Sequence, residues 1–234
     1  MAKNNDKAPF GIVIAGQLKP GATLRARGIA QTIAGAHKAA ANGNKFWTYT
    51  TAVGAGNRFY VFAPFQDHSQ LGSFTHDQAM GTSSSAGNAD ELLTQIEETL
   101  QGTQRSIVEY LPAYSNHPTD EGAAPGPYLF CVAFKIRPGK TLRAKELAAK
   151  IAEGHKQGSG GLKFWVYGTT VGTGGEYFVV IPFNSYADID GWGSAGQSLG
   201  GASDADALLG EFDSLISESN RMILEYVPDC SNPA

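Results

Sequence analysis

The chain has 234 residues, of which 42% are hydrophobic and 10% aromatic, and its formal net charge is −4. This composition is typical of a folded globular protein, and the weak negative charge argues against a nucleic-acid or anionic-membrane partner, which would require a basic surface. The start, MAKNNDKAP, has no apolar signal core, and no segment reaches the roughly 20 apolar residues of a bilayer span, so we expect a cytoplasmic protein, while noting that a processed secreted or periplasmic chain would look the same.

The first half of the chain predicts a strand, an amphipathic helix, a two-stranded hairpin, a second helix and a last strand. The first helix has Ala26, Ile33 and His37 on one apolar stripe, and the hairpin turns around Gly54 and Gly56. The predicted elements lie at residues 11–19, 23–40, 45–53 with 58–65, about 92–100, and 106–112.

The second half repeats this order at an offset of 118 residues. KPGATLRA at 19–26 returns as RPGKTLRA at 137–144, and KFWTY at 45–49 returns as KFWVY at 163–167. The order β-α-β-β-α-β is that of a ferredoxin-like unit. We therefore predict an α+β protein of two tandem ferredoxin-like units that form an intramolecular α/β barrel. The expected boundaries are 8–116 for the first repeat, 117–127 for a Gly/Pro-rich linker and 128–230 for the second repeat.

Helices on one face of each sheet leave the other face bare, so we expect the two sheets to cover one another. Side chains alternate between the faces of a strand. One parity of the strand at 45–53 is identical in both repeats, whereas on the other parity only Phe46 is kept. The identical residues are Lys45, Trp47, Tyr49, Thr51 and Val53, with Lys163, Trp165, Tyr167, Thr169 and Val171. We predict that Trp47 and Tyr49 face away from the helices, together with the small and polar residues of the first strand.

The strand ending in (K/R)-P-G, the W-x-Y strand, the Gly-rich hairpin and the (Y/F)-V-x-x-P-F strand together resemble the dimeric α/β-barrel superfamily. The chain is most similar to the antibiotic-biosynthesis-monooxygenase-like and NIPSNAP-like members. The resemblance covers both halves and implies a barrel that the family usually builds from two chains. It also implies a range of activities, from cofactor-free oxygenases and isomerases to haem enzymes, without a catalytic residue to carry over.

The repeated aromatic residues are the first candidate for a site, because Trp and Tyr can stack on a flat apolar ligand and hydrogen-bond to it. The alternative is that they only seal the interface between the two repeats. The full candidate set for ligand binding is Trp47, Tyr49, Trp165, Tyr167, Gln17, Lys135, Glu109 and Glu225. A buried Glu109 or Glu225 could act as a general base, and a solvated or salt-bridged carboxylate is the alternative reading.

A second set of candidates lies at the ends of the first helix of each repeat. His37 and His155 end the apolar stripe, and are either pocket imidazoles, including axial ligands of a haem, or residues that bind free carbonyls at a helix end. Arg25 and Arg143 lie in the first helical turn, where the helix dipole disfavours a cation, which predicts a salt bridge first and an anion contact second.

The sequence predicts neither a metal nor a cofactor. Asp67, His68, His76 and Asp77 lack metal-ligand spacing, and the two cysteines, Cys131 and Cys230, are too few for a disulfide framework, leaving a single bridge between them as the alternative to free thiols. The divergent stretches 66–89 and 184–205 are candidate lids, with Phe74, Met80, Tyr186, Ile189 and Trp192 as their apolar residues.

We therefore expect a protein that binds a small apolar or aromatic molecule in a barrel pocket, with cofactor-free monooxygenase or isomerase activity as the candidate reaction. The competing hypothesis is a non-catalytic structural or assembly protein. The expected state is either a monomeric pseudo-dimer or a homo-oligomer.

Overall fold

The computed structural model describes residues 8–40, 43–73, 89–117, 126–158, 161–172, 174–192, 199 and 205–233. The chain divides into two compact units, which are described separately. Unit 1 contains Met1–Val108 and Leu224–Ala234, and unit 2 contains Glu109–Ile223. Each unit therefore includes the final segment of the other sequence repeat.

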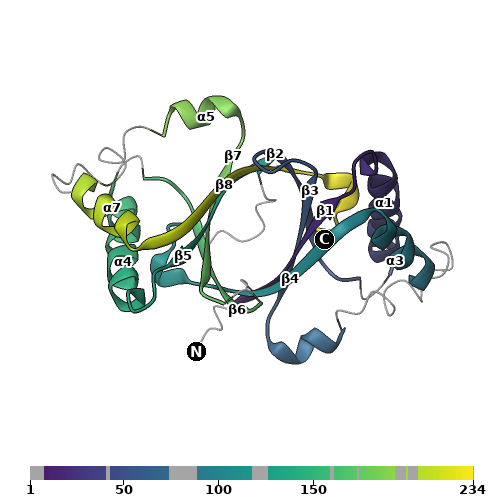
Figure 1. Ribbon diagram of the computed structural model, residues 1–234, viewed down its shortest axis with the longest axis horizontal. Helices are drawn as coiled ribbons and strands as arrows, with labels where there is room; N and C mark the ends of the chain where they lie inside the picture. Colours follow the sequence, from purple (N-terminus) through teal and green to yellow (C-terminus); the bar gives the residue numbers. More distant parts are fainter. Residues whose placement is uncertain are drawn as a thin grey trace. The chain divides into compact units, whose positions relative to one another are not determined.

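The predicted order of strands and helices is confirmed in both halves (Figure 1). The first half contains β1 (Phe10–Leu18), α1 (Thr23–Ala39), β2 (Trp47–Val53), β3 (Arg58–Phe65), η1 (His68–Ser73), α3 (Ala89–Glu98), β4 (Leu100–Tyr110) and η2 (Pro112–Tyr114). The second half contains β5 (Tyr128–Ile136), α4 (Thr141–Gln157), β6 (Trp165–Val171), β7 (Glu176–Phe183), α5 (Tyr186–Asp190), α7 (Ala205–Ser214), β8 (Ile216–Tyr226) and η3 (Pro228–Cys230).

The eight strands have the closed hydrogen-bonded order β1-β3-β2-β8-β5-β7-β6-β4, which is that of a closed barrel. Within unit 1, β3 pairs antiparallel with both β1 and β2, and Trp47 lies opposite Phe62. Within unit 2, β7 pairs antiparallel with both β5 and β6, and Trp165 lies opposite Val180. The two Trp residues therefore occupy the same register position in their units.

The apolar core of unit 1 lies between α1 and one face of its sheet. Ala34 of α1 is fully buried and packs with Phe46 and Ala63, and the partly buried Ile12 and Val61 complete this cluster. An Ala side chain at the contact lets the helix approach the strands closely. Figure 1 shows α1 and α3 together along this sheet.

Unit 2 repeats the arrangement with larger side chains. Ala152 of α4 is fully buried and packs with Phe164, Val166 and Ile181. Because Phe46 and Phe164 face the helices, strand alternation places Trp47 and Trp165 on the opposite face. The predicted division of the repeated strand into two faces is confirmed.

The last strand of each repeat starts earlier than its apolar pattern predicts. β4 begins at Leu100 and β8 at Ile216, about six residues before the expected start. The added stretches, 101–105 and 217–221, are exposed along their whole length. An exposed polar strand has no alternating apolar signal, so the sequence pattern marks only its buried end.

Each repeat ends in a Ser-Asn pair that fastens the final segment to the sheet, and we call these pairs the Ser-Asn clamps. In unit 1, the Thr48 N–H donates to Ser231 Oγ over 2.9 Å, and Ser231 Oγ donates to the Val227 carbonyl over 2.8 Å. The Asn232 side-chain amide donates to the Asn44 carbonyl over 2.8 Å. Ser231 and Asn232 are buried, so these bonds are shielded from water.

The clamp of unit 2 has the same bonds in the same order. The Val166 N–H donates to Ser115 Oγ over 2.9 Å, Ser115 Oγ donates to the Leu111 carbonyl over 2.9 Å, and the Asn116 amide donates to the Leu162 carbonyl over 2.7 Å. Both repeats therefore hold their final segments with the same set of backbone and side-chain bonds.

Candidate functional site

A Trp-Tyr-Thr row lies on the helix-distal face of the repeated strand in each unit. In unit 1 the row is Trp47, Tyr49 and Thr51, with successive Cα atoms about 6.6 Å apart. The Trp47 ring lies 6.0 Å from Phe62 between centroids, tilted by 30°, and Tyr49 lies 5.6 Å from Tyr226. Tyr49 is 5% exposed, so this part of the face is shielded from solvent.

Two polar atoms of the unit 1 row are buried without a partner. Within the described part of the chain, neither Trp47 Nε1 nor Thr51 Oγ1 has a hydrogen bond. The Thr169 hydroxyl, at the matching place in unit 2, is also buried and unbonded. An unsatisfied buried polar group costs about 1–3 kcal/mol, so a row that carries such groups in both units calls for a ligand, a water molecule or a structural reason.

The unit 2 row consists of Trp165, Tyr167 and Thr169, and its Trp is covered differently. The imidazole of His117 stacks on the Trp165 ring with centroids 4.0 Å apart and planes 19° apart. Tyr110 lies 5.7 Å from Tyr167. His117 is the first residue of the segment predicted as a linker, and no local sequence pattern marks it as a site residue.

Burial dominates the ionisation of the groups near the unit 2 row. It raises the pKa of the Tyr167 phenol, and the neighbouring Tyr110 and Cys131 add to the rise. Burial also raises the pKa of the Cys131 thiol to about 12. Both groups are therefore protonated at neutral pH, and neither provides a ready anionic base or nucleophile.

Gln17 and Lys135 already have intramolecular partners at the ends of their strands. The Gln17 amide donates to the carbonyls of Gly56 and Asn57, and its Oε1 accepts from Arg58 Nε over 2.8 Å. Lys135 Nζ donates to Glu218 over 2.7 Å. Gln17 thus holds the turn between β2 and β3, and Lys135 forms an ion pair with β8, so the polar groups of both side chains are already engaged on the face that carries the rows.

Glu109 and Glu225 lie on the opposite face from the rows. Tyr226 contacts Tyr49 and Tyr110 contacts Tyr167, so the preceding Glu of each strand points to the other side. Glu225 is exposed. A buried general base is therefore not what the structure shows at Glu225, because its carboxylate remains hydrated.

His37 and His155 are buried on the helix side of their units. His37 is 1% exposed, its Nδ1 accepts the Asn44 N–H over 3.2 Å, and its ring packs edge-on against Phe46 at 5.2 Å. His155 packs edge-on against Phe164 at 5.3 Å. Both rings lie at helix ends, but the bond observed for His37 comes from a backbone N–H and is not the predicted bond to a free carbonyl. The tight packing of both rings against Phe side chains does not fit an axial haem ligand.

The salt bridges predicted at Arg25 and Arg143 are present. Arg25 donates to Glu98 over 2.6 Å. Arg143 donates to Glu211 over 2.7 Å and to Glu146 over 3.0 Å. The partners lie on the second helix of each unit or on α4 itself, which explains how a cation is tolerated in a first helical turn.

Of the four residues considered as metal ligands, the structure describes Asp67 and His68. Asp67 accepts from the N–H and hydroxyl of Ser69, and the His68 ring packs against Phe10 at 4.6 Å. His76, Asp77, Phe74 and Met80 lie outside the described residues. Within the described residues, no group of three or more His, Cys, Asp or Glu could hold a metal ion. In the second predicted lid, α5 is described and Tyr186 contacts Tyr128 at 5.1 Å.

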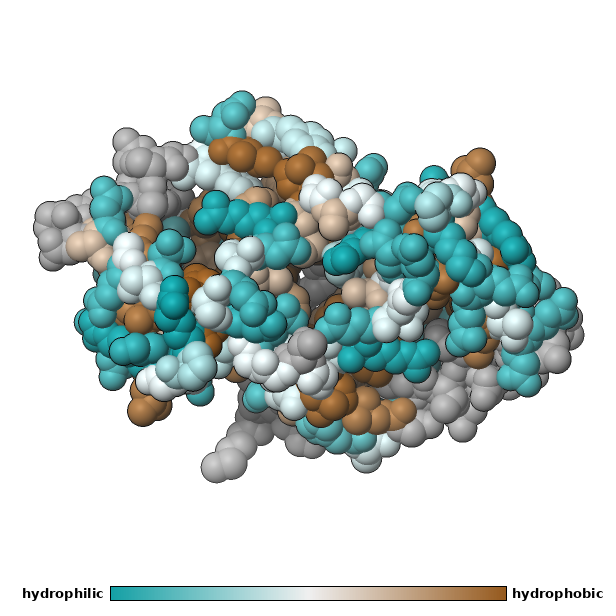
Figure 2. All heavy atoms as spheres, in the orientation of Figure 1, coloured by the Kyte–Doolittle hydropathy of each residue, from teal (hydrophilic) through white to brown (hydrophobic). Residues whose placement is uncertain are grey.

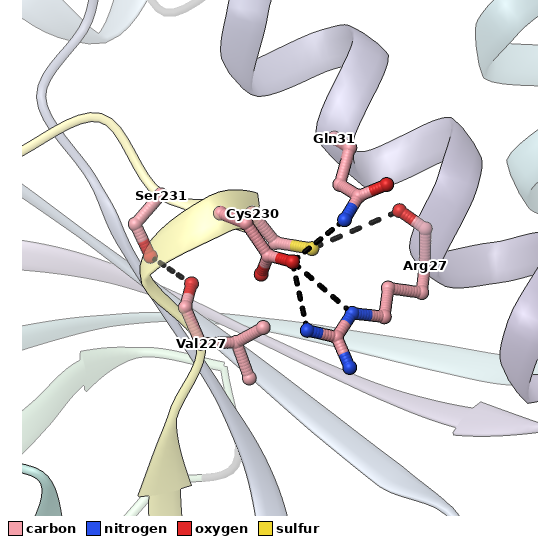
Figure 3. Close-up of polar contacts among 6 residues, drawn as sticks. Arg27, Gln31, Val227, Cys230 and Ser231 are labelled. Atoms are coloured by element: carbon pink, nitrogen blue, oxygen red, sulfur yellow. Dashed lines mark hydrogen bonds and ion pairs between the residues drawn. The ribbon is translucent and has the colours of Figure 1, made fainter.

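A polar network in unit 1 joins the final segment to α1 (Figure 3). Asp229 Oδ2 accepts from Arg27 Nη2 over 2.7 Å and from Gln31 Nε2 over 2.6 Å. The Cys230 thiol lies 3.7 Å from the Arg27 carbonyl, and both Cys230 and Cys131 are free thiols. Burial and the adjacent Asp229 raise the pKa of Cys230 to about 11.

The surface over α1 and α3 that Figure 2 shows is mainly hydrophilic. Among the described residues, few large apolar side chains are exposed. They are Leu24, Val53, Leu142, Val171 and Tyr186. In the part of the chain that the structure describes, every helix is too short or too polar to cross a bilayer.

No protein-family model matches the chain, and no curated protein matches it by sequence. Solved structures do share its fold. A candidate monooxygenase from Fusobacterium nucleatum aligns over 94% of this chain and 93% of its own with a TM-score of 0.62 and 10% identity. An anthrone oxidase-like protein aligns over 95% and 93% with a TM-score of 0.61 and 12% identity.

Chlorite dismutase from Candidatus Nitrospira defluvii, solved with imidazole, aligns over 96% of this chain and 93% of its own with a TM-score of 0.56 and 9% identity. The chain has the fold of these proteins. This agrees at the level of fold with the resemblance to the dimeric α/β-barrel superfamily. Identities of 9–12% carry no site residue across.

Proposed function

We propose that the protein binds a small apolar or aromatic molecule against the helix-distal Trp-Tyr-Thr face. One observation carries the proposal: this face combines large aromatic rings with the buried, unbonded Trp47 Nε1 and Thr51 Oγ1. A flat ligand with an acceptor atom would stack on the rings and satisfy a donor at once.

The candidate reaction is a cofactor-free monooxygenation, with isomerisation as the second choice. Support comes from the fold neighbours, which include a candidate monooxygenase and an anthrone oxidase-like protein. We further propose that the chain is a tandem fusion of two ferredoxin-like units, because the two sequence halves repeat one another element by element. The protein would then act as a monomeric pseudo-dimer or as a homo-oligomer.

A purely structural role is the second candidate, and the ring contacts favour it. Tyr49, Tyr167 and Trp165 each already have an aromatic neighbour within 6 Å. Rings that only seal the fold would show the same contacts without any ligand. A haem is the weakest candidate, since its support is a likeness to chlorite dismutase and the packing of His37 and His155 speaks against it.

Titration with the dye 8-anilinonaphthalene-1-sulfonate distinguishes the first two candidates. The binding proposal predicts saturable fluorescence at one or two dyes per chain, weakened at least tenfold when the Trp of an occupied row is replaced with Ala. A structural role predicts no saturable binding and only a loss of stability, of about 3–5 kcal/mol for a buried Trp. A visible absorption spectrum of the purified protein tests the haem candidate, which requires a Soret band.

A further inference from the structure

We infer that the two rows are not equivalent: the unit 1 row receives a neutral planar aromatic ligand that carries a hydrogen-bond acceptor, whereas His117 occupies the corresponding place in unit 2. This inference rests on the proposed function and assigns it to one of the two units. It follows from what covers Trp47 and Trp165, which stand at the same register position of identical W-x-Y-x-T strands.

His117 lies on Trp165 as a flat ligand would. The 4.0 Å centroid distance and 19° interplanar angle describe a face-to-face stack, the arrangement in which an aromatic ligand covers an indole. His117 directly follows the Ser-Asn clamp of unit 2, whose Asn116 is held by the Leu162 carbonyl. The clamp fixes the backbone immediately before the imidazole, so the ring is anchored at the indole face.

Unit 1 has the same clamp without the ring. The residue after Asn232 is Pro233, which is exposed and has no aromatic plane. In the described chain, Trp47 has one ring contact, a tilted one with Phe62 at 6.0 Å from the neighbouring strand. Among the described residues of unit 1, none takes the place on Trp47 that His117 takes on Trp165.

The hydrogen-bonding state of the unit 1 row specifies the ligand further. Trp47 Nε1 can only donate, and it is buried without an acceptor among the described residues. The Thr51 hydroxyl on the same face is also unbonded. Trp47, Tyr49 and Thr51 are uncharged, and Lys45, which precedes them on the same parity, is exposed. A carbonyl or ether oxygen on a neutral ring system therefore suits the buried part of the row better than a carboxylate.

Equilibrium dialysis with the matched pair 9-fluorenone and fluorene tests this inference, because the two differ by one carbonyl oxygen. We expect one fluorenone per chain in the wild type. Trp47→Phe keeps a ring but removes the N–H, and should weaken fluorenone about three- to tenfold while leaving fluorene nearly unchanged. Trp165→Phe should change neither. His117→Ala should raise the capacity to two fluorenones per chain, whereas His117→Phe keeps a stacked ring and should hold it at one.

The outcomes separate the two levels of the argument. Absence of binding to the wild type, with every variant folded by circular dichroism, overturns the proposed function and the inference together. One fluorenone lost with Trp165→Phe, two equivalent sites in the wild type, or a capacity of one in His117→Ala overturns the inference and leaves the proposed function standing. If His117→Ala does not fold, His117→Ser serves in its place.

Discussion

Units 1 and 2 hold their final segments with the same Ser-Asn clamps but with different side-chain contacts. The Ser-Asn clamps make the same bonds in both, to Thr48 in one unit and to Val166 in the other. Just before the clamp, unit 1 has Asp229, which accepts hydrogen bonds from Arg27 and Gln31. Just before the clamp of unit 2, Tyr114 packs on the apolar cluster around Ala152 of α4.

This difference shows which parts of the repeat are constrained. Bonds to backbone groups depend on a geometry that both units share, so the residues that make them are identical. Contacts between side chains depend less on backbone geometry. An ionic network in unit 1 can therefore stand where unit 2 has an apolar cluster. The same freedom allows His117 to stack on Trp165, whereas no described residue stacks on Trp47 in this way.

The largest expected effect is the slow alkylation of the two buried thiols, Cys131 and Cys230, relative to free cysteine. The pKa is about 12 for Cys131 in unit 2 and about 11 for Cys230 in unit 1, because both are buried. The reactive thiolate fraction falls tenfold for each unit of pKa, so at pH 8 iodoacetamide should modify both at least about 100-fold more slowly than free cysteine. Cys230 should react first. Peptide mass spectrometry over time measures this, and faster labelling of Cys131 would reverse the comparison.

The clamps should matter equally in both units. Asn116→Ala and Asn232→Ala each remove a buried hydrogen bond and leave a carbonyl unsatisfied, so each should lower the free energy of unfolding by about 2 kcal/mol. Urea unfolding measures both variants, with the exposed Gln101→Ala as control. If only one variant loses unfolding free energy, the two clamps do not stabilise their units equally, despite their matching bonds.

The His117–Trp165 stack should contribute less to the free energy of unfolding than either clamp bond. His117→Ala should lower the free energy of unfolding by about 1 kcal/mol and change the Trp fluorescence, since an aromatic pair contributes about 0.5–1.5 kcal/mol. Pro233→Ala, at the matching position of unit 1, should leave the fluorescence unchanged. Equal spectral effects from the two variants would remove the proposed asymmetry.

The Asp229 network should give unit 1 a small pH dependence. Hydrogen bonds from Arg27 and Gln31 lower the pKa of Asp229 against the opposing effect of burial. A lowered pKa in the folded state stabilises the fold above the unfolded pKa of about 4, and this contribution is lost as the pH falls through the folded pKa. Asp229→Asn should therefore cost at most about 1 kcal/mol at pH 7, because the pair is partly exposed, and nothing at low pH. A cost that persists unchanged below the folded pKa would contradict this assignment.

Much of the fold follows from the sequence because its signals are periodic. The apolar stripe containing Ala26 marks α1, and the alternation of Phe46 and Trp47 assigns the two faces of β2. Repetition strengthens both signals, since each pattern occurs twice. Arg25 and Arg143 stood out because a cation in a first helical turn requires a partner.

The rest depends on contacts without a local period. His117 and Trp165 are 48 residues apart, and a single His in a Gly/Pro-rich segment gives no sign of its partner. The Ser-Asn clamps did carry a signal, because SN is repeated at 115–116 and 231–232. This signal does not reveal the clamp, because a short Ser-Asn pair is also typical of a turn. The clamp becomes evident only when the buried backbone partners of the pair are known.

The unequal binding of the two rows is tested most directly by the indole N–H resonances of Trp47, Trp165 and Trp192 in a ¹⁵N–¹H correlation spectrum. Each is assigned by a single Trp→Phe variant. Adding 9-fluorenone should shift the Trp47 Nε1–H signal downfield as it gains an acceptor, and adding fluorene should not produce this downfield shift. The Trp165 signal should stay in place with both. A Trp47 signal that does not respond to fluorenone, or a Trp165 signal that moves equally, would contradict this account.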